Sequence, residues 1–179
     1  MTTDWWLPAL GFWGVWLFVP ILVDGYQAFN YLAATILGRA KRLPIRPVTE
    51  APRGKWPRVT IIVPVYNSQE QLGACLQSIK RQSYPNELIE VLAIDNGSKD
   101  DSYRVFCEEQ QADWPGQIHW MSTFHQGKTW ALNAGIHFAR GDYIINVDSD
   151  VVLHEDAVAN MVAAFEHDED LIAATGAVE

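Results

Sequence analysis

Hydrophobic residues follow two different patterns along the chain. Up to about residue 38 they form nearly unbroken runs, whereas from residue 59 short β-branched runs alternate with runs at helical spacing. The first pattern is typical of a membrane helix and the second of an α/β domain. We therefore divide the chain into an N-terminal membrane anchor (1–38), a basic, proline-containing linker (39–58) and a domain (59–179).

The anchor contains nineteen uncharged residues, 5–23. That length is close to the roughly 20 residues that a helix needs to cross a bilayer. We predict an N-terminal transmembrane helix, which continues past Asp24 as one long or kinked helix. The alternatives are a cleaved signal peptide, which needs a basic start that residues 1–4 lack, and a buried core helix.

Basic residues follow the apolar run and none precedes it. By the positive-inside rule, this asymmetry predicts a cell-membrane protein with a single span and a cytoplasmic domain. Residues 1–58 carry a charge of +4 and residues 59–179 carry −13, which together give the net charge of −9. The basic linker would contact membrane lipid, while the acidic domain lacks the basic surface that nucleic-acid binding requires. Cys75 and Cys107 do not make a disulfide framework, and we expect two buried free thiols.

The domain alternates strands and helices. The expected strands are 59–63, 89–94, 117–121, 143–147 and 171–175, and the expected helices are 72–79, 100–111, 128–139 and 155–166. This order predicts a mostly parallel, Rossmann-like α/β sheet flanked by helices. Ligands of such sheets bind at the carboxyl ends of the strands.

Polar groups stand at four of these strand ends. They are Pro64, Tyr66 and Asn67 after the first strand, Asp95 and Asn96 after the second, Lys128 after the third, and Asp148 and Asp150 after the fourth. Each alone could be a turn residue, a surface lysine or a helix cap. At one edge of one sheet they indicate a binding site.

Asp148 and Asp150 are two carboxylates two residues apart. Both can face one Mg²⁺ or Mn²⁺ ion, which prefers oxygen ligands and leaves positions for phosphate. Lys128, at a helix start, adds positive charge for the same phosphates. Tyr66 and Asn96 are placed to stack on and hydrogen-bond a base.

Four segments, VTIIVPVYNSQEQLGACLQSI, VLAIDNGSKDDS, GKTWALNAGI and GDYIINVDSD, together resemble the family 2 glycosyltransferases of GT-A fold. The resemblance runs from about residue 59 to about residue 176. WGVWLFVPILVD, VFCEEQ and YIINVDSDVVLHEDAV further resemble the membrane glycosyltransferases associated with the bacterial exosortase G system.

This resemblance implies an inverting hexosyltransferase of polysaccharide biosynthesis. It would transfer sugar from a nucleotide-sugar, a UDP-sugar, to a glycan, cell-surface or lipid-linked acceptor. Residues 64–66 and Asn96 would hold the uracil, although the family often has Asp where Asn96 stands. Lys128 would face the diphosphate, Asp148 would lie near the ribose and metal, and Asp150 would bind the metal directly.

No catalytic residue is identified, because nothing here matches the family's general base, which we expect beyond Glu179. The chain resembles the donor-binding half of the family, and we expect it to be inactive alone. One alternative is a truncated nucleotide-binding fragment that transfers no sugar. Another is a P-loop-like NTPase, since residues 127–129 match the end of a Walker A motif, but Ser122 stands where that motif needs glycine.

Overall fold

A computed structural model describes residues 6–36, 55–124, 127–168 and 170–176 of the 179-residue chain. The chain divides into two compact units, Met1–Pro44 and Ile45–Glu179. Most of the predicted linker (39–58) lies outside the described residues.

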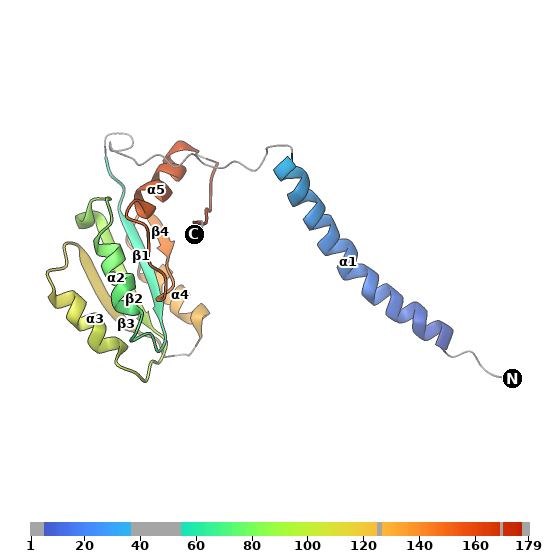
Figure 1. The fold of residues 1–179 in the computed structure, drawn as a ribbon, viewed down its shortest axis with the longest axis horizontal. Helices are drawn as coiled ribbons and strands as arrows, with labels where there is room; N and C mark the ends of the chain where they lie inside the picture. The colour runs from blue at the N-terminus through green and yellow to red at the C-terminus, as the bar shows by residue number, and fades with distance from the viewer. Residues whose placement is uncertain (1–5, 37–54, 125–126, 169, 177–179) are drawn as a thin grey trace. The chain divides into compact units, whose positions relative to one another are not determined.

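The described residues of the first unit form one α-helix, α1 (Trp6–Ile36), of 31 residues (Figure 1). The helix continues through Asp24, which confirms the prediction of one long helix. The predicted transmembrane helix, however, is not found: within the described ranges no helix is long and apolar enough to cross a membrane. Polar Asp24, Gln27 and Asn30 interrupt the apolar sequence of α1.

The second unit is built on a four-stranded, all-parallel sheet of order β3-β2-β1-β4. Its strands are β1 (Val59–Val65), β2 (Ile89–Asp95), β3 (Gln117–Ser122) and β4 (Tyr143–Asn146). Its helices are α2 (Leu72–Lys80), the 3₁₀ turn η2 (Asn86–Leu88), α3 (Ser102–Gln111), α4 (Lys128–Phe138) and α5 (Ala157–His167). The predicted α/β parallel sheet with flanking helices is confirmed.

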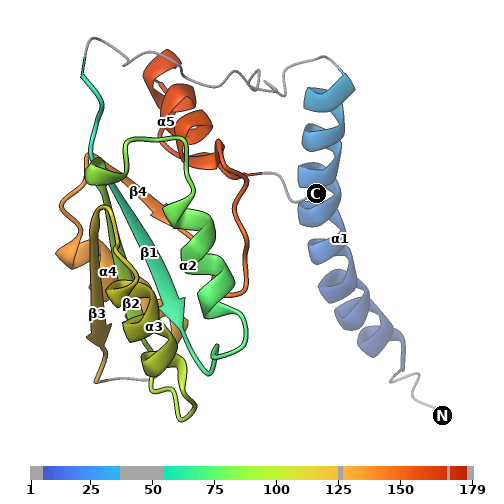
Figure 2. The ribbon, with the colours of Figure 1, turned by 60° about the vertical axis from the view of Figure 1, so that its left-hand side comes forward.

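The two faces of the sheet pack against different helices. Buried side chains of α2, α3 and α5 meet alternate residues of β1 and β2 on one face. On the other face, Ala131 of α4 packs with Ile62, Leu92 and Ile94. Figures 1 and 2 show α2 and α3 on one side of the sheet and α4 on the other. Because the strands are parallel, the loops that follow them meet at one edge.

Strand β1 continues through Pro64 to Val65, two residues beyond the predicted end. Val147 N–H donates to Ile62 O at 3.0 Å, so the even-numbered residues of β1 direct their backbone groups toward β4. The last residue pair of the β1–β4 ladder is Ile62 with Asn146. Residue 64 would direct its N–H toward β4, but the β1–β4 ladder has already ended there. The missing N–H of Pro64 therefore costs no hydrogen bond between β1 and β2.

The fifth predicted strand, 171–175, is wrong, since residues 171–176 form no regular structure. Its short apolar run shares no ladder with a strand of the sheet. Hydrophobic side chains alone do not define a strand, because its backbone N–H and C=O groups need a neighbouring strand as partner.

Candidate functional site

Four side-chain contacts join the loops after β1, β2 and β4 to the start of α4. We call this set the loop ring: Asn67–Ser98, Asn96–Gly127, Lys128–Asp148 and Ser149–Ser68. Each contact links two of these four segments, so that together they close a circuit at the carboxyl edge of the sheet. Of the eight predicted site positions, five lie in these loops and Lys128 is the first residue of α4. Pro64 is the second-last residue of β1, and Asp95 is the last residue of β2.

Asn67 holds the loops after β1 and β2 together. Its N–H donates to Ser98 Oγ at 3.0 Å, and its Oδ1 accepts the Lys99 N–H at 2.8 Å. Asn67 has φ 48°, in the left-handed region that Asn adopts more readily than most residues. Asp95 Oδ1 accepts the Ser98 N–H at 2.9 Å. Asp95 thus fixes the serine that Asn67 contacts.

Asn96 connects the loop after β2 to α4. Its N–H donates to Val65 O at 2.9 Å, and its Oδ1 accepts the Gly127 N–H at 2.6 Å. Gly127 has φ 132°, a conformation that favours glycine. Since the amide oxygen of Asn96 is directed to α4, its NH₂ group, a double donor, points the other way.

Asp148 and Asp150 follow β4 directly. Lys128 Nζ lies 2.7 Å from Asp148 Oδ1, and the two side chains are 56% and 45% exposed. Asp150 is exposed. In the described part of the chain, no three His, Cys, Asp or Glu side chains form a group that could hold a metal. Two carboxylates nevertheless suit Mg²⁺ or Mn²⁺, which is commonly held by one or two carboxylates together with substrate phosphates and water.

The buried thiol of Cys75 lies under these carboxylates and donates to Asp148 O at 3.6 Å. Burial, and then the charges of Asp150 and Asp148, raise the pKa of Cys75 to about 12. The thiol is therefore neutral at ordinary pH and packs as a core residue. Both cysteines are free, as predicted, but Cys107 is only partly buried.

Serines beside the predicted site residues were missed by the sequence analysis. Ser68 is 6% exposed, and its hydroxyl lies 2.7 Å from that of Ser149, 81 positions away. Ser68 N–H donates to Ser102 Oγ at 2.8 Å, which donates to Asp100 Oδ1 at 2.6 Å. The only sequence signal for these serines is their position inside the family motifs.

The same network lowers the pKa of Asp100. Burial works to raise that pKa, but the hydrogen bonds from the Ser102 hydroxyl and from the N–H groups of Gln69 and Ser102 outweigh it. Asp100 therefore remains a carboxylate that supports the loops after β1 and β2. Tyr66 lies at the end of β1 with its side chain 55% exposed, as a base-stacking residue would require.

Acidic residues after the Asp148–Asp150 pair contact neighbouring side chains. Asp156 Oδ1 accepts the Ser83 hydroxyl at 2.7 Å, and Glu166 Oε1 accepts the Tyr143 hydroxyl at 2.7 Å. Asp156 makes no side-chain hydrogen bond that caps α5. These acids hold the loop and α5 to the domain.

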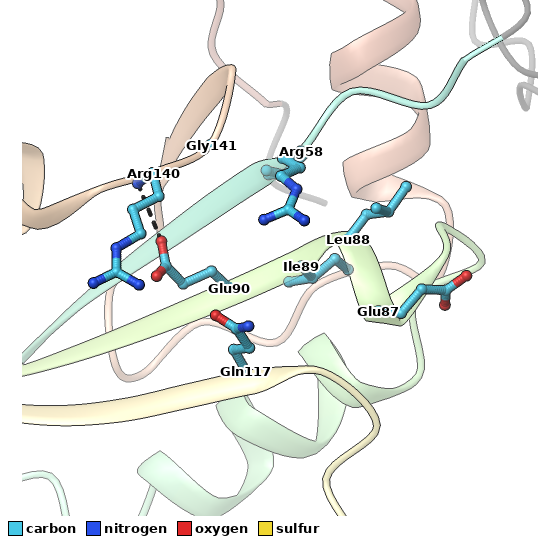
Figure 3. A pocket seen from close by; sticks show the side chains of 9 residues that line it. Arg58, Glu87, Leu88, Ile89, Glu90, Gln117, Arg140 and Gly141 are labelled. Atoms are coloured by element: carbon cyan, nitrogen blue, oxygen red, sulfur yellow. Dashed lines mark hydrogen bonds between the residues drawn. The ribbon is translucent and has the colours of Figure 1, made fainter.

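A pocket lies at the opposite, amino edge of the sheet (Figure 3). Arg58, Arg140 and Gln117 surround Glu90, whose Oε2 accepts the Thr60 hydroxyl at 2.8 Å and the Arg140 N–H at 3.2 Å. Because this buried carboxylate is already bonded within the fold, we place the candidate site at the carboxyl edge.

Comparison with known proteins identifies the family of this chain. Residues 60–178 match the model of glycosyl transferase family 2. The chain belongs to glycosyl transferase family 2. The matched range includes the loops after β1 and β2 and the start of α4.

Individual family members are similar to this chain over somewhat less than two thirds of its length. The uncharacterized glycosyltransferase YfnE of Bacillus subtilis (strain 168) is 36% identical over 115 residues, 64% of this chain and 29% of that protein. An N-acetylglucosaminyltransferase of Mesorhizobium japonicum is 34% identical over 114 residues, 63% of this chain and 27% of that protein. The chain thus spans less than a third of the length of either relative.

Among solved structures, the mannosyltransferase PcManGT from Pyrobaculum calidifontis, in complex with GDP-Man and Mn²⁺, is similar with a TM-score of 0.60. It is 29% identical, and the match covers 76% of this chain and 42% of that one. The similarity supports a GT-A fold for the second unit.

Proposed function

We propose that this chain binds a nucleotide-sugar donor at the loop ring and serves a membrane-attached, inverting glycosyltransferase. The observation that carries the proposal is the convergence of Asn96, Lys128 and the Asp148–Asp150 pair at one edge of the sheet. A nucleotide-sugar with a divalent cation would need such groups side by side: an amide for the base, an ammonium for the diphosphate and carboxylates for the cation. The relative complexed with GDP-Man and Mn²⁺ supports the same ligand class.

Each residue would have a distinct role. Tyr66 would stack on the base, and the NH₂ of Asn96 would donate to a base carbonyl. Lys128 and the backbone N–H groups at the start of α4 would hold the diphosphate. Asp148 and Asp150 would hold Mg²⁺ or Mn²⁺, which when bound offsets the charge that develops on the leaving diphosphate.

The reaction would proceed by attack of an acceptor hydroxyl on the anomeric carbon. The C–O bond to the nucleotide diphosphate breaks, the acceptor hydroxyl gives its proton to a general base, and the sugar is transferred with inversion. We propose a UDP-sugar as the donor and a glycan or lipid-linked molecule as the acceptor, in line with the exosortase-associated resemblance.

Attachment to the cytoplasmic side of the cell membrane is a separate part of the proposal. On α1, large apolar side chains including Trp13, Phe18, Leu22 and Phe29 are each more than 60% exposed. The seven basic residues among the first 58 would then contact anionic lipid. Flotation of the chain with vesicles, lost on deletion of residues 6–36, would test this attachment.

Thermal unfolding tests the donor site. UDP with Mn²⁺ should raise the melting temperature, because a ligand that binds only the folded state stabilises it. Asp150→Ala should remove the metal-dependent part of that shift. Glu87→Ala, an exposed carboxylate at the amino edge, should keep it. An unchanged melting-temperature shift in Asp150→Ala would contradict the metal assignment. A shift with GDP but none with UDP would contradict the choice of uracil as the base.

A further inference from the structure

Lys128 contacts the residue that is proposed to bind the metal. Its Nζ lies 2.7 Å from Asp148 Oδ1. A divalent cation at this oxygen would lie within a few ångströms of the ammonium group, where like charges repel. The ammonium and the metal therefore compete for one carboxylate oxygen.

Resting on the proposed function, we propose that Lys128 is an exchangeable counter-ion: it neutralises Asp148 in the empty site and moves to the diphosphate when metal and nucleotide bind together. In the empty site the ion pair disfavours metal alone. In the filled site Asp148 would face the metal while Lys128 faces the phosphate oxygens.

The surroundings of Lys128 permit this movement. It is the first residue of α4, and its side chain is 56% exposed on four rotatable carbon–carbon bonds. Rotation from Asp148 toward a phosphate breaks one ion pair, in which the Lys128 side chain is half exposed although the Asp148 Oδ1 atom is buried. Backbone N–H groups at the same helix end favour an anion there.

Positive coupling between the two ligands follows. Metal alone must displace Lys128, and nucleotide alone must draw Lys128 from Asp148, so each ligand should strengthen binding of the other. The coupling depends on one side chain. Removal of that side chain should affect the two single-ligand affinities in opposite directions.

The test measures each ligand separately on the purified chain. Mn²⁺ affinity without nucleotide is read from the electron paramagnetic resonance signal of free Mn²⁺, and UDP affinity is read by calorimetry in EDTA. Lys128→Met should bind Mn²⁺ alone about fivefold more tightly, because the mutation removes one half-exposed ion pair. It should bind UDP more weakly.

Two variants serve as controls. Lys128→Arg keeps the positive charge and should retain the weak Mn²⁺ affinity of the wild type. Arg104→Met removes an equally exposed cation from the ion pairs with Asp101 and Glu108 on α3, and should change neither affinity. Matching unfolding temperatures in EDTA would verify that every variant is folded.

The outcomes separate the two proposals. If the wild type binds neither UDP nor GDP in the presence of Mn²⁺, the proposed function is wrong, and the counter-ion role fails with it. If the wild type binds nucleotide with Mn²⁺ but Lys128→Met binds Mn²⁺ alone no more tightly, the counter-ion role is wrong and the donor site stands. Tighter Mn²⁺ binding together with weaker UDP binding supports both.

Discussion

At the amino edge of the sheet, the Glu90 carboxylate is 9% exposed and accepts bonds from Thr60 and Arg140. At the carboxyl edge, Asp148 is 45% exposed and is joined to Lys128. The buried carboxylate has partners fixed by the fold, including a backbone N–H that cannot move away. The Asp148 carboxylate is half exposed, and its partner is the long, half-exposed side chain of Lys128. This difference indicates that charge at the amino edge supports folding, while charge at the carboxyl edge is available for binding.

The largest expected effect is at the amino edge, in Gly141→Ala. An added Cβ would lie 2.5 Å from Thr60 N and 2.8 Å from Val59 C, both backbone atoms that cannot yield without moving β1. We expect a loss of about 3 kcal/mol in the free energy of unfolding, measured with urea. Gly73→Ala on α2 is the control, since its Cβ would meet nothing closer than 3.5 Å. Equal stability of the two variants would show that the amino edge is not rigid.

A second effect, of about 1 kcal/mol at pH 10, is expected under the carboxyl edge. Burial, with the charges of Asp150 and Asp148, raises the pKa of Cys75 from 9.0 to about 12. The folded state then holds this proton more tightly than the unfolded state does. The contribution of this proton to the free energy of unfolding is therefore complete below pH 9 and is lost as the pH rises from 9 toward 12.

Denaturant unfolding between pH 8 and pH 10 measures this decline. Cys75→Ala should reduce the slope, whereas Cys107→Ala should keep it. Tyr84, whose pKa burial raises from 10.0 to about 12, adds to the decline above pH 10, so the comparison ends there. An identical slope in Cys75→Ala and the wild type would show that burial and the nearby carboxylates do not raise the pKa of this thiol.

The smallest effect is expected in the loop ring, where Ser149→Ala should cost about 0.5 kcal/mol, because one partly exposed hydrogen bond contributes little. A double-mutant cycle with Ser68→Ala should give a coupling energy of similar size. Ser149→Ala and Ser98→Ala share no partner and should be additive. Additivity of Ser149→Ala with Ser68→Ala would mean that their hydroxyl contact contributes nothing.

Sequence patterns predicted the sheet well, because each strand and helix of the second unit has its own local period. Strand 171–175 was wrong because pairing depends on a partner that a local pattern does not contain. The end of β1 was placed too early, since proline is excluded only where a ladder bond is required. Asp148 and Lys128 could be predicted as site residues, because ligands of parallel α/β sheets bind at the carboxyl ends of the strands. Their direct contact could not, because it depends on side-chain rotamers.

The hydroxyl contacts were beyond prediction for a related reason. Serine carries no sequence period, and Ser68 meets Ser149 across 81 positions. The N-terminal helix shows a different case. Its sequence correctly predicted one long helix, but the prediction of a membrane span was not met, because Asp24, Gln27 and Asn30 interrupt the apolar sequence.

Pro64 has a consequence for the neighbouring strand. The next rung of the β1–β4 ladder would need an N–H from residue 64 to reach Val147 O, and proline has none. The hydrogen bonds between β1 and β4 therefore end at Val147, one residue before Asp148. Asp148 O then accepts the Val151 N–H at 3.0 Å instead, and the chain turns out of the sheet. The missing N–H of Pro64 thus marks where β4 ends and where the loop that carries Asp148, part of the proposed ligand site, begins.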